Sequence, residues 1–294
     1  MGAGDTGVND TIVRHVAGRS VEAAGADGDP QWRYVYGGVA KPYIHPLCTP
    51  AGVPITGFQP HSHPWHRGVW FTIKYVNGEN YWEEGEEAGA AGHGTQVTVA
   101  PPVLSHDAAD AAVIRSDLRW TMPDRRTVVA EEVRSVAFRP VDGALALDWS
   151  VSLTAMTDLV LDRTPFTTWG GYGGMSARLT RGCRRSRMLL PDGTTSERPA
   201  GETAPWCDLA GDLDGGVRAA GGVAVFDHTG NPRHPSPWYG AAGSMNFLNA
   251  AFLFHERMRV PEGETLAFRY RILVHDGLWE VDRLQEAYDR WVAA

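Results

Sequence analysis

The chain has 294 residues, of which 43% are apolar and 21% charged, and its net charge is −8. The apolar fraction supports a large buried core and argues against a disordered chain. The negative charge argues against nucleic acid as a partner, because no large cationic surface is available to neutralise phosphates. No apolar run reaches the roughly 18 residues of a membrane span, and the N-terminal segment lacks a secretory signal pattern, so we expect a cytoplasmic protein without a membrane partner. The three cysteines are odd in number and widely spaced, which argues against a disulfide framework or a thiolate zinc site.

Short runs in which every second residue is apolar recur along the chain and predict β-strands. The run 69–75 alternates between two faces, with Val69, Phe71, Ile73 and Tyr75 on one side and Trp70, Thr72 and Lys74 on the other. The stretch 83–94 predicts a flexible loop. The runs 127–138 and 144–155 flank an Asp-Gly pair, which predicts a hairpin.

The second half of the chain continues the same pattern. The glycine-rich stretch 170–178 predicts a close strand approach or a bulge, and 191–203 predicts a flexible loop. The runs 221–226 and 265–274 predict two further strands, the second with five apolar residues on one face.

A single segment, 278–292, has the period of a helix. Val281, Leu284, Tyr288 and Trp291 form one apolar stripe, which predicts a C-terminal helix packed on the side of the sheets. With no repeat and no long linker, the pattern predicts one all-β domain over 1–294. We expect a large antiparallel β-sandwich with a C-terminal helix.

The first polar cluster surrounds the stretch "HSHPWHRG" at 61–68. It contains His45, His61, His63, His66 and Arg67, and ends with Glu83 and Glu84. Pro60 and Pro64 keep these histidines on a loop at the entrance of the 69–75 strand. The imidazoles could bind a divalent metal ion with a carboxylate such as Glu84, act as acids and bases, or simply be turn residues bonded to carbonyls.

The second polar cluster, "FDHTGNPRHPSPWY" at 226–239, has no apolar period that core packing would explain. Its polar and aromatic residues are Asp227, His228, Asn231, Arg233, His234, Trp238 and Tyr239. Such groups bind carboxylates and hydroxyls or stack on a sugar face. The alternative is a rigid turn in which Arg233 binds loop carbonyls.

These clusters and the stretches around them resemble a known family. The elements "HPxHRGxWF" and "DHxxNPRHPxxW", together with "KPYIHPLCTPAGV", "VNGENYWEE", "APWCDLAG" and "GETLAFRYRILVHDG", are similar to the PmoA-like family, which also carries the label "methane oxygenase". The resemblance spans residues 41–277. Membrane methane monooxygenase consists of transmembrane helices, so we reject methane oxidation. The resemblance instead implies a soluble, galactose-mutarotase-like supersandwich linked to sugar oxidoreductases.

The family loop usually reads Asp-His-Pro-His-His/Arg-Gly, and this chain departs from it at two positions. Ser62 stands where the Asp is expected, and Trp65 replaces a histidine, whereas His63, His66 and Gly68 match. The loss of the Asp weakens the metal hypothesis and favours His63 and His66 over His61. Further positions that match the family pattern are Glu84, Arg178, Trp206, Asp208, His228, Asn231, Arg233 and His234.

The resulting hypothesis is a carbohydrate-active enzyme that cleaves an oxidised (3-keto) glycoside by acid/base β-elimination, with a partner oxidoreductase installing the ketone. The predicted catalytic residues are His63, His66, His228 and His234. The predicted substrate-binding residues are His45, Arg67, Trp82, Glu84, Arg178, Asn231, Arg233 and Trp238. A divalent metal remains an option, with His61, His63, His66 and Glu84 as candidate ligands. Direct hydrolysis, a mutarotase- or epimerase-like enzyme, and a non-catalytic carbohydrate-binding accessory protein are the alternatives.

Overall fold

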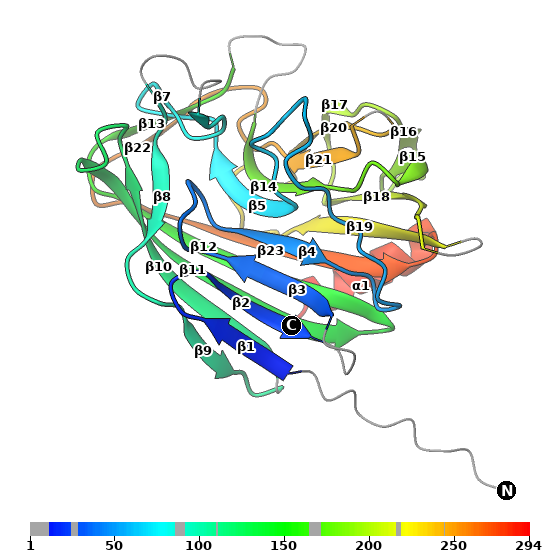
Figure 1. Ribbon diagram of the computed structural model, residues 1–294. Helices are drawn as coiled ribbons and strands as arrows, with labels where there is room; N and C mark the ends of the chain where they lie inside the picture. Colours follow the sequence, from blue (N-terminus) through cyan, green and yellow to red (C-terminus); the bar gives the residue numbers. More distant parts are fainter. Residues whose placement is uncertain are drawn as a thin grey trace, which may run out of the picture.

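The computed structural model describes residues 12–24, 29–85, 92–109, 111–164, 172–215, 219–243 and 245–294. Within this part of the chain, the strands form three antiparallel sheets and a helix closes the sequence (Figure 1). The predicted all-β class with a C-terminal helix is confirmed. Among the described residues, no helix is long and apolar enough to cross a membrane.

One sheet has nine strands and combines the N-terminal strands with strands from the second half of the chain. In spatial order they are β1 (Ile12–Val16), β2 (Ser20–Ala24), β3 (Pro30–Val35), β4 (Tyr43–Leu47), β5 (Val69–Ile73), β14 (Gly173–Arg178), β21 (Phe247–Ala250), β20 (Pro237–Ala241) and β17 (Ala200–Thr203).

The second sheet has ten strands, and a third, small sheet has four. The ten-stranded sheet runs β16 (Thr195–Ser196), β15 (Arg184–Leu189), β18 (Trp206–Asp212), β19 (Ala220–Asp227), β23 (Thr265–Asp276), β12 (Ala144–Ala155), β11 (Val128–Val141), β10 (Ala112–Thr121) and β8 (Thr95–Thr98), with β9 (Val103–His106) also on β10. The small sheet runs β22 (Met258–Val260), β13 (Leu159–Asp162), β6 (Tyr75–Val76) and β7 (Glu79–Asn80).

The main core lies between the two large sheets. Trp32 of β3 stacks on Phe138 of β11 with ring centroids 3.8 Å apart, and Phe71 of β5 lies 5.3 Å from Phe268 of β23. Both pairs join one sheet to the other and belong to the same buried apolar cluster. The two sheets therefore form a sandwich.

The predicted 127–138 and 144–155 strands form the hairpin β11–β12. Val141 pairs with Ala144, so the connection is two residues long. Asp142 and Gly143 both have positive φ, of 50° and 77°, which is the backbone that an Asp-Gly hairpin turn supplies. The other predicted strands, 221–226 and 265–274, are β19 and β23.

The glycine-rich stretch 170–178 contains β14, while residues 170 and 171 lie outside the described part. Gly174 has φ +96°, and a Cβ there would lie 2.4 Å from the carbonyl oxygen of Ala250. A side chain at this position would therefore collide with the neighbouring backbone. The predicted close strand approach is confirmed.

Two expectations about local structure need correction. The 69–75 run is divided, since β5 ends at Ile73, Tyr75 begins β6 of the small sheet, and Lys74 between them pairs with Glu83. The stretch 191–203 is not simply a loop, since β16 and β17 pair with β15 and β20 and satisfy backbone groups at the sheet edges. Of the predicted loop 83–94, residues 86–91 lie outside the described part.

The helix α1 (Val281–Val292) begins three residues later than predicted. Its buried residues Leu284, Ala287 and Tyr288 pack on Phe226 and Leu273, which lie in a second apolar cluster on the outer face of the ten-stranded sheet. The predicted position beside the sheets is correct.

Candidate functional site

A pocket on the outer face of the nine-stranded sheet contains the two histidines of the 61–68 loop. It has a volume of about 500 Å³ and is lined by His63, Trp65, His66, Lys74, Tyr75, Trp82, Glu83, Thr164, Tyr172, Tyr239, Met245 and Phe247. Most of these residues come from the 61–68 loop, the segment 74–83 and the strands β20 and β21, and Thr164, Tyr172 and Met245 lie outside named strands. We call it the His63 pocket.

The loop that carries the histidines is held by its own backbone. The amide of His63 donates to the carbonyl of Pro60, and the amide of His66 donates to the carbonyl of His63. At its end, Gly68 has φ +67°, and a Cβ there would lie 2.2 Å from the carbonyl oxygen of Ile44. The loop therefore passes so close to β4 that only glycine fits.

His63 and His66 lie next to each other, with ring centroids 4.8 Å apart. His66 is buried, with 2% exposure, and packs on Phe247 and Trp70 at 4.8 and 5.1 Å. Burial, helped by the charges of Arg178, His63 and Lys41, holds the pKa of His66 well below its usual value. His66 is therefore neutral at neutral pH.

Arg178 lies behind His66 and fixes its tautomer. Its Nη1 approaches His66 Nδ1 at 3.4 Å, and a guanidinium can only donate, so the His66 proton is on Nε2. That N–H makes no hydrogen bond to any described residue. The Arg178 side chain is 1% exposed, pairs with no carboxylate in the described part of the chain, and has its pKa lowered by burial to about 10. A buried cation without a counter-ion favours an anion or a developing negative charge nearby.

His63 lies at the pocket surface and is partly exposed. Partial burial and the charge of Arg178 lower its pKa, while Glu83 acts in the opposite direction. The imidazole is thus neutral near pH 7 and can accept a proton.

The pocket lining also includes an ion pair and two hydroxyls. Lys74 pairs with Glu83, and burial lowers the pKa of Lys74 against the raising effect of that carboxylate. The hydroxyls of Tyr172 and Tyr239 lie 3.5 Å apart. Acid, base and hydrogen-bonding groups therefore surround the same space.

Aromatic rings form much of the remaining wall. Trp82 stacks on Tyr172 with centroids 4.9 Å apart, within an apolar cluster that also holds Phe247. Trp65 Nε1 and Thr164 Oγ1 are buried without a hydrogen-bond partner among the described residues. Such a wall suits a ligand with an apolar face and hydroxyls around its rim.

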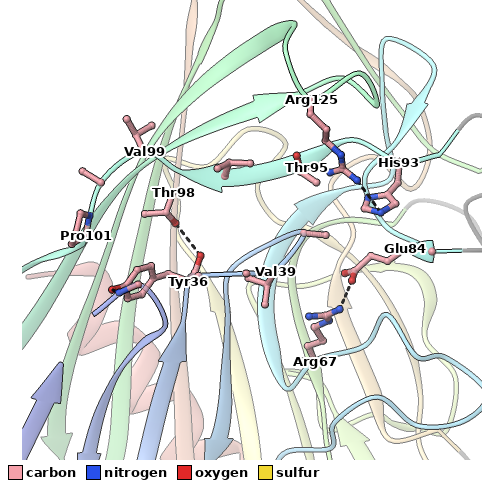
Figure 2. A pocket seen from close by; sticks show the side chains of 17 residues that line it. Tyr36, Val39, Arg67, Glu84, His93, Thr95, Thr98, Val99, Pro101 and Arg125 are labelled. Atoms are coloured by element: carbon pink, nitrogen blue, oxygen red, sulfur yellow. Dashed lines mark hydrogen bonds and ion pairs between the residues drawn. The ribbon is translucent and has the colours of Figure 1, made fainter. Parts of the chain in front are cut away.

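Four of the predicted binding residues on this side of the sheet do not line the His63 pocket, and one of them, Arg178, lies behind His66. Arg67 and Glu84 pair with each other and line a neighbouring pocket (Figure 2). His45 stacks on Phe58 at 4.8 Å and contacts Thr56 Oγ1 at 2.9 Å. Burial, helped by Arg33, lowers the pKa of His45 to about 4.

The four candidate metal ligands do not converge. His61 is exposed, and it does not line the pocket of His63 and His66. The Glu84 carboxylate is occupied by Lys41 and Arg67. Within the described residues, no three His, Cys, Asp or Glu side chains are placed to hold an ion.

The second polar cluster lies apart from the His63 pocket and binds mainly to itself. The buried Asp227 carboxylate accepts bonds from Asn231 Nδ2 at 2.7 Å, His234 Nδ1 at 2.9 Å and the amide of Ser236 at 2.8 Å. Arg233 donates to the carbonyls of Phe252, Glu256 and Arg257. This is the rigid turn that was the alternative interpretation.

The other two predicted site residues of that cluster, His228 and Trp238, also pack against structural parts of the fold. His228 lies beside Trp291 of the helix, with centroids 5.3 Å apart. Trp238 is fully buried and donates Nε1–H to the carbonyl of Ala204 at 2.9 Å. Of this cluster, only Tyr239 lines the His63 pocket, so the two clusters do not meet in that pocket as the sequence hypothesis required.

Residues 23–289 match the model of a family described as "Family of unknown function (DUF6807)". The chain belongs to this family. No curated protein matches it. Among solved structures, the Slr1438 protein of Synechocystis sp. PCC 6803 is similar at 11% identity and a TM-score of 0.39, covering 94% of this chain and 99% of that one. A galactose mutarotase related enzyme from Lactobacillus acidophilus is similar at 10% identity and a TM-score of 0.34, covering 90% and 97%.

Several residues of the pocket in this DUF6807 member were missed by sequence reasoning. The sequence places Lys74 on one face of a predicted strand, and it predicts no site role for Tyr172 or Phe247. The signal available for Lys74 was a single lysine between apolar strand residues with a Glu-Glu pair following nine residues later. Nothing in the sequence indicates that Tyr172 and Phe247 face His66.

Proposed function

We propose that the protein is an acid/base enzyme that acts on a sugar or glycoside in the His63 pocket. The observation that carries the proposal is the trio of His63, His66 and Arg178. It combines an accessible neutral base, a neutral N–H donor and a buried cation without a carboxylate partner in the described chain. Together they can remove a proton and stabilise the negative charge that results. The aromatic walls and unpaired polar groups suit a sugar ring.

The reaction proposed is β-elimination from a 3-keto glycoside. The ketone at C3 acidifies the C2–H bond, and His63 removes that proton. The C3 oxygen takes up negative charge, which the Nε2–H of His66 stabilises with Arg178 behind it. The electron pair then forms the C1–C2 double bond as the C1–O1 bond breaks. Lys74, with its lowered pKa, protonates the leaving oxygen.

This assignment differs from the roles first expected for the second cluster. His228, His234 and Arg233 do not line the His63 pocket, so Lys74 takes the part of the acid, and His66 with Arg178 holds the enolate. The PmoA-like resemblance, which implies a functional link to a sugar oxidoreductase, supports a ketone-bearing substrate.

The test uses two 3-keto glucosides, one of 4-nitrophenol and one of methanol. We expect release of both aglycones, and none from the unoxidised glucosides. His63→Ala should slow release by about 100-fold or more, whereas His61→Ala, an exposed histidine of the same loop, should leave it unchanged. Lys74→Ala should affect methanol release more than nitrophenolate release, because nitrophenolate leaves without a proton.

One combination of results would contradict the proposal. If the folded protein releases neither aglycone, and if sugar binding is unaltered in His63→Ala, the enzyme assignment is wrong. The protein would then be a carbohydrate-binding accessory protein.

A second candidate is anomer exchange of a free sugar. Glu83 lines the same pocket as His63 and acts on its pKa, and such a pair can move one proton from O1 and one to the ring oxygen. Magnetisation exchange between the two anomers of a free aldose would detect it. An exchange rate equal to that of buffer would exclude it for the sugar tested.

A further inference from the structure

A second pocket, of about 700 Å³, lies beside the His63 pocket and shares its wall. Two segments contribute to both pockets: His66 and Glu83 line the first, and their neighbours Arg67 and Glu84 line the second. The proposed reaction uses none of the residues of the second pocket. We call it the Arg125 pocket.

Among the described residues at one end of the Arg125 pocket, positively charged side chains outnumber carboxylates. Arg67 and the buried Lys41 share one carboxylate, that of Glu84. Arg125 pairs with no carboxylate among the described residues. Figure 2 shows Arg125 and Arg67 on the same side of the pocket, with His93 and Glu84 between them.

His93 holds the Arg125 guanidinium in place without neutralising it. Its Nδ1 lies 3.0 Å from the carbonyl of Gly94, so Nδ1 carries the proton, and its Nε2 accepts from Arg125 Nη2 at 3.2 Å. Both nitrogens of the imidazole are therefore used. Within the described part of the chain, the other donors of Arg125 have no hydrogen-bond partner and can face a ligand.

The other end of the pocket is apolar. Val39, Val97, Val99 and Pro101 line it, and Val97 and Val99 are 46% and 51% exposed. Exposed valines that face a cavity indicate an apolar ligand surface rather than a packed core. The pocket thus joins two guanidinium groups to an apolar floor.

We propose that the Arg125 pocket binds a small carboxylic acid with an apolar body, such as an aromatic acid. The carboxylate would accept hydrogen bonds from Arg125 and lie near Arg67, since a guanidinium fork matches a carboxylate. The apolar body would cover Val97 and Val99. This binding does not depend on the proposed function of the His63 pocket.

Isothermal titration calorimetry with benzoate, benzyl alcohol and acetate tests the proposal on the full chain. Benzoate carries both features, benzyl alcohol lacks the charge and acetate lacks the apolar body. We expect saturable binding of benzoate, at least about tenfold weaker binding of the other two, and weaker benzoate binding at higher ionic strength.

Two variants of one turn provide the matched comparison. Arg125→Gln should weaken benzoate binding about tenfold or more, and Arg125→Lys should restore part of it. Arg126→Gln removes the adjacent exposed arginine, which does not line the pocket, and should change nothing. The proposal is overturned if benzoate does not bind, if benzyl alcohol binds as tightly, or if the two glutamine variants behave alike. Because the readout is heat of binding and not turnover, failure here leaves the His63 pocket unaffected.

Discussion

Two adjacent glutamates of β11 should differ sharply in their contribution to stability. Glu132 forms an ion pair with Arg134 in which both side chains are 0% exposed, with Arg134 Nε 2.6 Å from Glu132 Oε1. It also accepts a bond from Trp120 Nε1 at 2.8 Å. Glu131 points the other way and pairs with Arg119 at 3.3 Å, with both side chains about half exposed.

The expected magnitudes follow from burial. Removing one partner of a buried ion pair costs roughly 3–5 kcal/mol, because the other charge stays buried without compensation. Glu132→Gln keeps the shape and one oxygen acceptor, so we expect the lower end, about 3 kcal/mol. An exposed pair contributes roughly 0–1 kcal/mol, so Glu131→Gln should change the free energy of unfolding by less than about 1 kcal/mol.

Urea denaturation at pH 7, followed by tryptophan fluorescence and by circular dichroism, measures both variants. Equal slopes with denaturant in the variants and the parent protein would allow the midpoints to be compared directly. A loss below about 1 kcal/mol for Glu132→Gln, or equal losses for the two variants, would refute the argument from burial.

Three further outcomes are expected. Because the pKa of His63 is lowered below 6.5, turnover that needs neutral His63 should lose activity only below that pH, measured as kcat/KM against pH. Removing the nearby cation in Arg178→Met should raise the pKa of His66, observed by NMR titration of its ring protons, and an unchanged titration would contradict the contact. The pKa of His45 is lowered to about 4 from 6.5, so between these values the unfolded chain binds a proton that the folded chain does not. Stability should therefore fall as pH is lowered through this window, and a His45→Gln variant that showed the same fall in urea titrations would argue against this cause.

The fold was predictable where the alternation of apolar residues was regular. The runs that became β12 and β23 bury one face and carry polar residues on the other, so their sequence records their environment. The buried face of β11 could not be predicted in the same way. Glu132 and Arg134 are charged residues that face the core, because each supplies the partner that the other needs, and a single sequence does not show such pairing.

The candidate site was predictable in part for the same reason. The 61–68 loop could be predicted as part of a site from its own prolines and histidines. The 226–239 loop carried an equally strong signal for a different cause, since the Asp227 carboxylate needs Asn231 and His234 as donors. Polar residues that hold a turn and polar residues that face a substrate are the same residue types. The two kinds are distinguished only by whether they lie near Tyr172 and Phe247, which are far from the 61–68 loop in the sequence.

The order of strands in the ten-stranded sheet has a consequence for how the chain folds. β23, which ends at Asp276, lies between β12 and β19, and Leu145 pairs with Val274, a residue 129 positions later in the sequence. The strand that joins the two halves of this sheet is therefore synthesised after both of its neighbours. Until it emerges from the ribosome, β12 and β19 present unpaired edges and apolar faces, a state prone to aggregation. Pairings so distant in sequence also form slowly, so this sheet should not be completed before β23 is synthesised, and truncation before β23 should leave a chain that does not fold.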